Sequence, residues 1–196
     1  MSPAGGWRQT ASQTVGPFFA YGLTPEQYGY PFASIADGRM ADESVSGERI
    51  RIIGRVLDGE GAPIEDALVE FWQADAQGRY ATAREPGSNR MFSGFGRQGT
   101  GTDPDNRFVF ETIKPGKVDA EQAPHISVIV LMRGLLTHAY TRIYFSDEAE
   151  ANARDPVLNS VPENRRRTLI ATRDADGLYR FDIHMQGDNE TVFFDV

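Results

Sequence analysis

Apolar and polar side chains alternate most clearly between residues 54 and 80. From Ala67 to Trp72 every second side chain shares one face, the period of a strand with one buried side. A turn signal stands on each side, at Asp58–Gly61 and at Asp75–Gly78, because Gly tolerates positive φ and Asp accepts hydrogen bonds from its own backbone. The pattern predicts strand, tight turn, strand, tight turn.

Further stretches from Arg49 onward carry the same strand signal. They are Ile50–Val56, Arg107–Thr112, Thr137–Phe145, Leu169–Arg173, Tyr179–Met185 and Val192–Phe194. The run Ile126–Met132 is almost continuously apolar and rich in β-branched residues, which predicts a central strand buried on both faces.

Two short helices interrupt the strands. Residues 146–154 have the acidic first turn of a helix, with Ser146 as the expected N-cap and Pro156 as the expected stop. A second helical turn is expected over 162–167. Many short strands separated by frequent turns predict an all-β fold, a β-sandwich of two mixed or antiparallel sheets, over residues 49–196.

Residues 1–48 differ from the rest of the chain. They are rich in Gly, Pro and Ser and show no sustained period, yet they hold large rings in Phe18–Tyr21 and Tyr28–Phe32. Such rings need a surface to bury them, either the main domain or a partner chain. We expect an ordered N-terminal arm that contacts a partner.

Composition excludes several classes of function. The 196 residues include 20 basic and 28 acidic side chains, and the formal net charge of −8 disfavours nucleic acid and anionic membranes. There is no cysteine, so disulfides and thiolate metal sites are excluded, and a reducing cytoplasm is a compatible location. We expect no secretory signal and no membrane span, because no apolar run is long enough.

Five segments together resemble the intradiol ring-cleavage dioxygenases. They are Ser12–Phe18, Gly54–Tyr80, Phe110–Gly116, Ala123–Val128 and Gln186–Asp195. The likeness extends from about Ser12 to the end of the chain, so it is more specific than any one motif. It implies a prealbumin-like sandwich and, in this family, a non-haem Fe(III) held by two tyrosinates and two histidines.

The resemblance also implies where those ligands would stand, and three of the four are missing. The His-Ile-His triplet of the family is His125-Ile126-Ser127 here, which keeps the first histidine only. Val118 and Met91 stand where the two tyrosines are expected. Fe(III) favours hard anionic oxygen donors, which these side chains do not supply. His125 is therefore a vestigial metal position, and we expect no catalytic residue and no metal ligand in this chain.

A rebuilt site elsewhere would need the remaining histidines, His138 and His184. A lone histidine on a strand is more often a hydrogen-bonded structural residue than a ligand. The tyrosines Tyr80, Tyr140 and Tyr144 are expected to serve packing, with each hydroxyl group hydrogen-bonded.

The resemblance is closest to family members built from two homologous chains, of which one, the β chain, carries the iron. It implies that this chain completes the β chain's Fe(III) site for O2-dependent intradiol cleavage of 3,4-dihydroxybenzoate to 3-carboxy-cis,cis-muconate. Thr14, Gly16 and Pro17 would line the substrate pocket from the arm. Arg133, at the end of the apolar strand, would attract the ring carboxylate.

Two other functions stay open at this point. One is a self-sufficient intradiol dioxygenase acting on catechols, which the missing ligands disfavour. The other is a non-catalytic β-sandwich binding module, which would not need the N-terminal arm. A pull-down would separate them, since the two-chain enzyme predicts a homologous partner in equal amounts.

Overall fold

The computed structural model describes residues 10–16, 18–81 and 92–196. Within them the strands are β1 (Arg49–Leu57), β2 (Leu68–Gln73), β3 (Phe95–Gly99), β4 (Arg107–Ile113), β5 (His125–Leu131), β6 (Ala139–Phe145), β7 (Ile170–Ala175), β8 (Leu178–Arg180) and β9 (Ile183–His184). The helices are α1 (Phe19–Leu23), α2 (Ala149–Asn152), α3 (Pro156–Ser160) and α4 (Glu163–Arg166), with two 3₁₀ turns, η1 (Glu26–Tyr28) and η2 (Arg167–Leu169).

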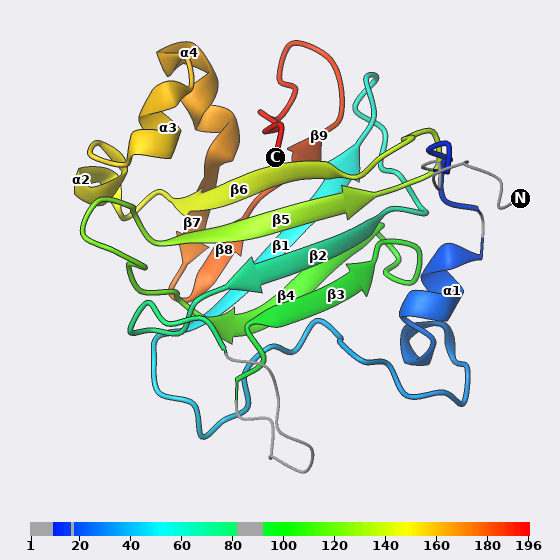
Figure 1. The fold of residues 1–196 in the computed structure, drawn as a ribbon. Helices are drawn as coiled ribbons and strands as arrows, with labels where there is room; N and C mark the ends of the chain where they lie inside the picture. The colour runs from blue at the N-terminus through cyan, green and yellow to red at the C-terminus, as the bar shows by residue number, and fades with distance from the viewer. Residues whose placement is uncertain (1–9, 17, 82–91) are drawn as a thin grey trace, which may run out of the picture.

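The strands follow one hydrogen-bonded path, in the order β3-β2-β5-β6-β7-β8-β1-β4, and β9 pairs with β1. Figure 1 shows β3, β2, β5 and β6 side by side nearest the viewer, with β1, β4 and β8 behind them. The path mixes antiparallel pairs with the parallel pairs β6–β7, β1–β8 and β1–β9. The expected all-β fold with mixed pairing is confirmed, as a nearly closed barrel.

The division into two separate sheets is not confirmed, because β7 joins the two groups of strands. It pairs in parallel with β6 through two residue pairs, Tyr144–Ile170 and Phe145–Ala171. It also pairs antiparallel with β8. A short strand that pairs on both sides makes the hydrogen-bonded path continuous at this point.

The inner faces of the strands enclose the main core. Phe71 stacks on Phe110 with ring centroids 3.9 Å apart, and Phe108 meets Phe71 edge-on at 5.9 Å. All three side chains are fully buried, as the alternation of β2 and β4 predicts. A second, smaller apolar cluster lies where the helical segment packs on the barrel, and it includes Tyr144, Leu158 and Leu169.

The N-terminal segment closes the barrel between its two edge strands. Arg97 of β3 donates its amide to the carbonyl of Asp37, at 3.0 Å, and Glu111 of β4 donates its amide to the carbonyl of Gly38, at 2.8 Å. Met40 follows with a side chain that is only 1% exposed in the main core. Residues 37–40 thus pair with β3 on one side and with β4 on the other, which protects both edges.

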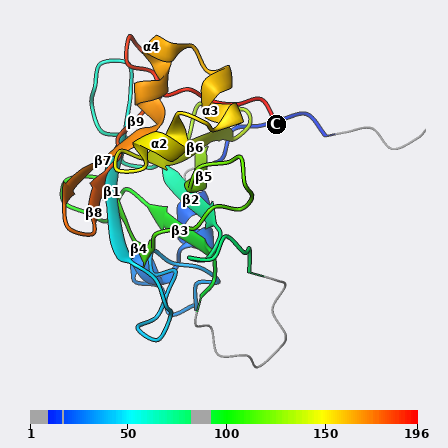
Figure 2. The same cartoon turned by 90° about the vertical axis from the view of Figure 1, so that its left-hand side faces the viewer.

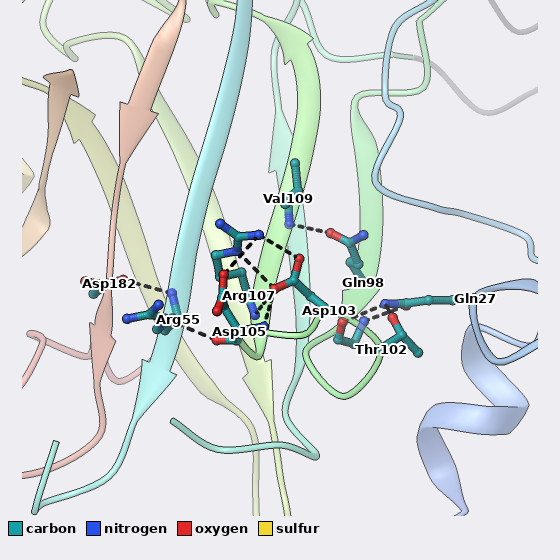
Figure 3. Close-up of polar contacts among 10 residues, drawn as sticks. Gln27, Arg55, Gln98, Thr102, Asp103, Asp105, Arg107, Val109 and Asp182 are labelled. Carbon is teal, nitrogen blue, oxygen red and sulfur yellow. Dashed lines mark hydrogen bonds and ion pairs between the residues drawn. The ribbon is translucent and has the colours of Figure 1, made fainter. Parts of the chain in front are cut away.

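A glutamine holds the preceding part of the same segment to the barrel (Figure 3). The amide group of Gln27 donates to the carbonyl of Gly99 and to Thr102 Oγ1, both at 2.7 Å, while its carbonyl accepts the amide of Gly99 at 2.8 Å. The neighbouring turn is fixed by Arg107, whose guanidinium binds both carboxylate oxygens of Asp103 at 3.0 and 3.2 Å. The arm is therefore attached to its own domain from η1 onward.

Three local predictions are wrong. The helix after β6 is only Ala149–Asn152, and Ser146 does not cap it, because its hydroxyl accepts the amide of Arg173 instead. Pro156 begins α3 rather than ending a helix, with Asp155 as N-cap. The last predicted strand is reduced to one bridge between Phe194 and Tyr140.

The strand β5 also differs from its prediction. Its burial alternates, so that Ile126, Val128 and Val130 point into the core while Ser127, Ile129 and Leu131 lie on a half-exposed outer face. None of the described helices crosses that outer face in Figure 1. The sequence pattern of a strand buried on both sides is thus met on one side only within this chain.

Candidate active-site face and substrate-contact residues

His125 and Ser127, which the resemblance compares with a metal-binding triplet, lie on the outer face of β5. His125 and Ser127 are two residues apart on one strand, so their side chains share that face. Ser127 lies opposite Trp72 of β2 on one side and opposite Arg142 of β6 on the other. Backbone pairing across three strands therefore brings these side chains into one surface.

His125 is buried, and one hydrogen bond fixes its tautomer. Its side chain is 4% exposed, and its Nδ1 lies 2.9 Å from the carbonyl oxygen of Ala123. Because a carbonyl only accepts, the proton stands on Nδ1 and leaves the lone pair on Nε2. Burial lowers the pKa of His125, so the neutral ring is favoured.

The neighbouring donors do not fit a ferric ion. The hydroxyl of Ser127 is 2.9 Å from the hydroxyl of Tyr140, so each group has a partner. Val118 is half-buried and has no donor atom, and Met91 lies outside the described residues. Burial raises the pKa of Tyr144, which keeps this phenol protonated rather than available as phenolate. One imidazole with neutral hydroxyls is a poor set of ligands for Fe(III).

The other histidines do not assemble a replacement site. His138 is exposed in the turn before β6, and His184 is half-buried on β9, with its amide bound to Thr191. Across residues 10–16, 18–81 and 92–196, no three His, Cys, Asp or Glu side chains are grouped closely enough to hold a metal ion.

An apolar cavity of about 300 Å³ lies on the same face, beside Ser127. Its described lining is Glu70, Phe71, Trp72, Phe95, Ser127, Ile129 and Tyr140. Trp72 stacks on Tyr80 with centroids 6.0 Å apart at 14°, and both rings remain about two-fifths exposed, at 44% and 40%. We call this surface, formed by Trp72, Tyr80, Ile129 and Tyr140, the aromatic face.

The structure brings two of the four predicted substrate contacts together. Thr14 Oγ1 accepts the amide of Gly134 at 2.8 Å, which places the arm directly beside Arg133. The Arg133 side chain is 60% exposed and forms an ion pair with Asp66. Its guanidinium therefore stays accessible at the end of β5.

The other two contacts receive less support from geometry. The carbonyl of Gly16 accepts the amide of Phe19 at 3.2 Å, at the start of α1. Pro17 lies outside the described residues. The roles of all four residues in a pocket therefore stay predictions.

A buried aspartate that the sequence analysis did not single out supports this region. Asp155 is fully buried, and its carboxylate accepts the amides of Ala123 at 2.8 Å and Leu158 at 2.7 Å and the hydroxyl of Tyr144 at 3.1 Å. It caps α3 and also fixes Ala123, whose carbonyl orients His125. The signal was present in the sequence, since Asp before Pro is typical of a helix start.

Comparisons with known proteins place these features in a family. A family model described as Dioxygenase matches residues 30–187. The chain is 55% identical over 193 residues to the protocatechuate 3,4-dioxygenase alpha chain of Burkholderia cepacia, covering 96% of this chain and 98% of that one. The chain belongs to the intradiol ring-cleavage dioxygenase family.

Other members of the intradiol dioxygenase family are similar at lower identity. The alpha chain of Pseudomonas putida is 43% identical over 95% of this chain and 96% of its own. The Burkholderia cepacia protocatechuate 3,4-dioxygenase beta chain is 35% identical over 161 residues, covering 74% of this chain and 67% of its own. Both chain types of one enzyme thus resemble this sequence.

Solved structures agree on the intradiol dioxygenase fold. An intradiol ring-cleavage dioxygenase from Tetranychus urticae superposes with a TM-score of 0.58 at 20% identity, over 81% of this chain and 93% of that one. A dioxygenase domain from Streptomyces sp. SirexAA-E gives 0.56 at 23% identity, over 80% and 94%. Among the described residues, no helix has the length and apolar content that crossing a bilayer requires.

Proposed function

We propose that this chain is the α subunit of a protocatechuate 3,4-dioxygenase. The enzyme would cleave 3,4-dihydroxybenzoate with O2 between its two hydroxyl groups, giving 3-carboxy-cis,cis-muconate. Identities of 55% and 43% to alpha chains over nearly the whole length support this assignment. The 35% identity to a beta chain supports a homologous partner of the same fold.

The observation that carries the proposal is the unsuitable set of donors around His125. Ser127 and Tyr140 satisfy each other, and Val118, at a position that the resemblance assigns to a tyrosine, offers no ligand, so these residues do not fit Fe(III). The iron that the family implies therefore belongs to the β chain, where it would activate the catecholate. This chain's own contribution is to bind and orient the substrate from across the interface.

Four residues of this chain carry that contribution in our proposal. Thr14, Gly16 and Pro17 of the arm line the β chain's pocket, and Arg133 attracts the substrate carboxylate. The bond between Thr14 and Gly134 supports this grouping, because it holds the arm beside the cationic side chain. In this proposal residues 1–48 form the arm and residues 49–196 form the core domain. The part of the arm before η1 acts toward the partner, while residues 27–40 stay bound to the barrel of this chain.

Two finer points belong to the same proposal. The barrel path is best treated as two packed sheets, β3-β2-β5-β6 and β7-β8-β1-β4, that meet at the short β6–β7 pairing. The enzyme is expected in the cytoplasm, since a chain without cysteine draws no stability from an oxidising compartment.

Reconstitution with a separately produced β chain tests the assignment. The isolated chain should hold no stoichiometric iron and show no tyrosinate absorption band, and a complex in equal amounts with the β chain should consume O2 when given 3,4-dihydroxybenzoate. If the isolated chain holds one tightly bound iron and cleaves catechols, it is a self-sufficient dioxygenase. If it forms no complex with the β chain, the α-subunit assignment fails.

A further inference from the structure

We propose that Asp66 is a positioning residue for the substrate carboxylate, because its ion pair holds the guanidinium of Arg133 in the orientation that binds the substrate. The inference deepens the proposed function and rests on it, since it takes Arg133 as the carboxylate contact. It adds a residue that the sequence analysis did not single out. The preference for a carboxylated ring then depends on a pair of side chains rather than on Arg133 alone.

Strand pairing brings Asp66 and Arg133 to the same end of the barrel. β5 runs from Ile129, in the aromatic face, toward Arg133, which lies just beyond the strand end. Leu68 of β2 pairs with Leu131 of β5, and Asp66 and Arg133 each lie two positions beyond that pair. Side chains at opposed positions of neighbouring strands are within reach of each other, and an ion pair joins these two. The register of the barrel therefore sets this contact.

The backbone around Asp66 is fixed on both sides by Thr100, which is fully buried. The hydroxyl of Thr100 donates to the carbonyl of Ile64 at 2.6 Å and accepts the amide of Ala67 at 3.2 Å. The amide of Thr100 donates to the carbonyl of Ala67 at 2.9 Å. The carboxylate of Asp66 is short, so few rotatable bonds separate it from this fixed turn. Asp66 is thus suited to anchor a longer side chain.

Arg133 has a fixed backbone and a long side chain that is 60% exposed. Thr14 Oγ1 accepts the amide of Gly134 at 2.8 Å, and the amide of Leu135 donates to the carbonyl of Met132 at 3.4 Å. Within residues 10–16, 18–81 and 92–196, Asp66 is the one side chain that bonds the guanidinium. Without this bond the exposed side chain would be free to adopt many rotamers, and ordering it would cost affinity each time substrate binds.

The bond to Asp66 leaves the outer part of the guanidinium available. It starts from Nε, and among the described residues neither terminal amino group of Arg133 donates a hydrogen bond. The guanidinium is planar and its N–H groups form a fixed fork, so a bond at Nε also sets the direction of the terminal groups. Those two groups match a carboxylate through parallel hydrogen bonds. Asp66 and a substrate carboxylate can therefore bind the same guanidinium at once.

The turn that carries Arg133 lies where a ligand from outside this chain can reach it. Figure 2 shows the first described residues, in dark blue, leading away from the body of the barrel on the side of β5 and β6. The bond between Thr14 and Gly134 ties this segment to the turn. The pair of Asp66 and Arg133 is thus placed at the outer surface, beside the arm that the proposed function directs to the partner's pocket.

Asp66 also repels the substrate carboxylate, so the relative magnitudes decide its net effect. The two carboxylates would stand about 7 Å apart on either side of the guanidinium, and in salt at an exposed site their repulsion weakens binding by about 2-fold. Ordering one long side chain in advance strengthens binding by about 3- to 10-fold. Orientation therefore outweighs repulsion, and the net effect of Asp66 is favourable.

Steady-state O2 uptake by reconstituted complexes tests this role. Asp66→Ala removes orientation and repulsion together, so KM for 3,4-dihydroxybenzoate should rise about 2- to 5-fold while kcat stays unchanged. Asp66→Asn keeps an acceptor for Nε and removes the charge, so its KM should not exceed that of wild type. Asp174→Ala is the matched control and should leave KM unchanged, because Arg180 and Asp174 form a similar ion pair with side chains 58% and 32% exposed.

Two further readouts distinguish a positioning role from a structural one. In the Arg133→Ala background, a further Asp66→Ala change should not raise KM, because the guanidinium that Asp66 orients is gone. Inhibition by 4-hydroxybenzoate should weaken about 2- to 5-fold in Asp66→Ala, whereas inhibition by the uncharged 4-hydroxybenzamide should stay the same.

The outcomes separate this inference from the proposed function. If Arg133→Ala raises KM while Asp66→Ala leaves it at or below the wild-type value, the positioning role is wrong and the α-subunit assignment stands. An equal change for both inhibitors, or a rise of KM that persists without Arg133, also overturns it. If Arg133→Ala leaves KM unchanged, the carboxylate contact and the role of Asp66 fail together. If the complex consumes no O2 with 3,4-dihydroxybenzoate, the proposed function itself fails.

Discussion

Replacing Arg133 by alanine in the reconstituted enzyme gives the sharpest test of a substrate contact. The guanidinium is 60% exposed and its carboxylate partner, Asp66, is 30% exposed, so the ion pair is a surface interaction. Its loss should lower the free energy of unfolding by no more than about 1 kcal/mol. Any larger effect of Arg133→Ala therefore has to come from the substrate.

The expected magnitude follows from a charge-assisted hydrogen bond to the ring carboxylate. Such bonds contribute about 1.5–3 kcal/mol when buried, and the solvent exposure of Arg133 reduces this to about 1–2 kcal/mol. Since about 1.4 kcal/mol is a tenfold change in affinity, KM for 3,4-dihydroxybenzoate should rise about 5- to 30-fold. The carboxylate is bound equally in the ground and transition states, so kcat should change little.

Steady-state O2 uptake by wild-type and variant complexes measures both constants. Arg180→Ala is a closely matched control, because Arg180 is 58% exposed and its partner Asp174 is 32% exposed. It removes an equivalent surface ion pair on another strand and should leave KM unchanged. A loss confined to kcat, or an equal rise of KM in both variants, would refute a carboxylate contact at Arg133.

Three further predictions concern the arm, the buried aspartate and the vestigial histidine. Phe18, 75% exposed in the free chain, should become protected from hydroxyl-radical labelling when the β chain binds, and unchanged labelling would contradict an arm at the interface. Asp155→Asn should lower the free energy of unfolding in urea by about 2–4 kcal/mol, because it replaces one buried acceptor oxygen with an NH2 group that faces a backbone N–H donor. The exposed Asp174→Asn should cost less than about 1 kcal/mol. Because burial lowers the pKa of His125, the unfolded chain binds a proton below about pH 6.5 that the folded chain does not, so stability should fall as the pH decreases from there. The stability of the His125→Asn variant should fall less than that of the wild type over the same pH range. Identical urea midpoints of wild type and variant at each pH would exclude this role of His125.

The local sequence pattern was sufficient to predict which strand side chains point into the barrel. Alternation placed Val69 and Phe71 of β2 inside and Glu70 and Trp72 outside, because a half-buried strand leaves a period of two in the sequence. The residue types at the positions that the resemblance compares with iron ligands, such as Val118, could also be read directly, since the chemistry of one side chain does not depend on how the chain folds.

Contacts between distant segments could not be predicted from the local sequence pattern. The placement of residues 37–40 between β3 and β4 depends on two edges that only the closed barrel creates. The predicted helix boundaries were wrong for a related reason. The side chains of Asp155 and Ser146 can each accept hydrogen bonds from more than one partner, and only the folded chain decides which bonds form. The apolar sequence of β5 predicted burial on both faces, whereas the structure buries only Ile126, Val128 and Val130 on the inner face and leaves Ser127, Ile129 and Leu131 half-exposed.

The parallel junction between β6 and β7 consists of only two residue pairs, and it divides the barrel into two halves. The half β3-β2-β5-β6 is wholly antiparallel and the other half mixes antiparallel and parallel pairs. The junction forms only when the helical segment between Phe145 and Ile170 folds back on the barrel. Closing that long connection costs entropy before its few hydrogen bonds form. The molecule should therefore open first along this line, and amide exchange at Ala171 should report the separation of the halves before either one unravels.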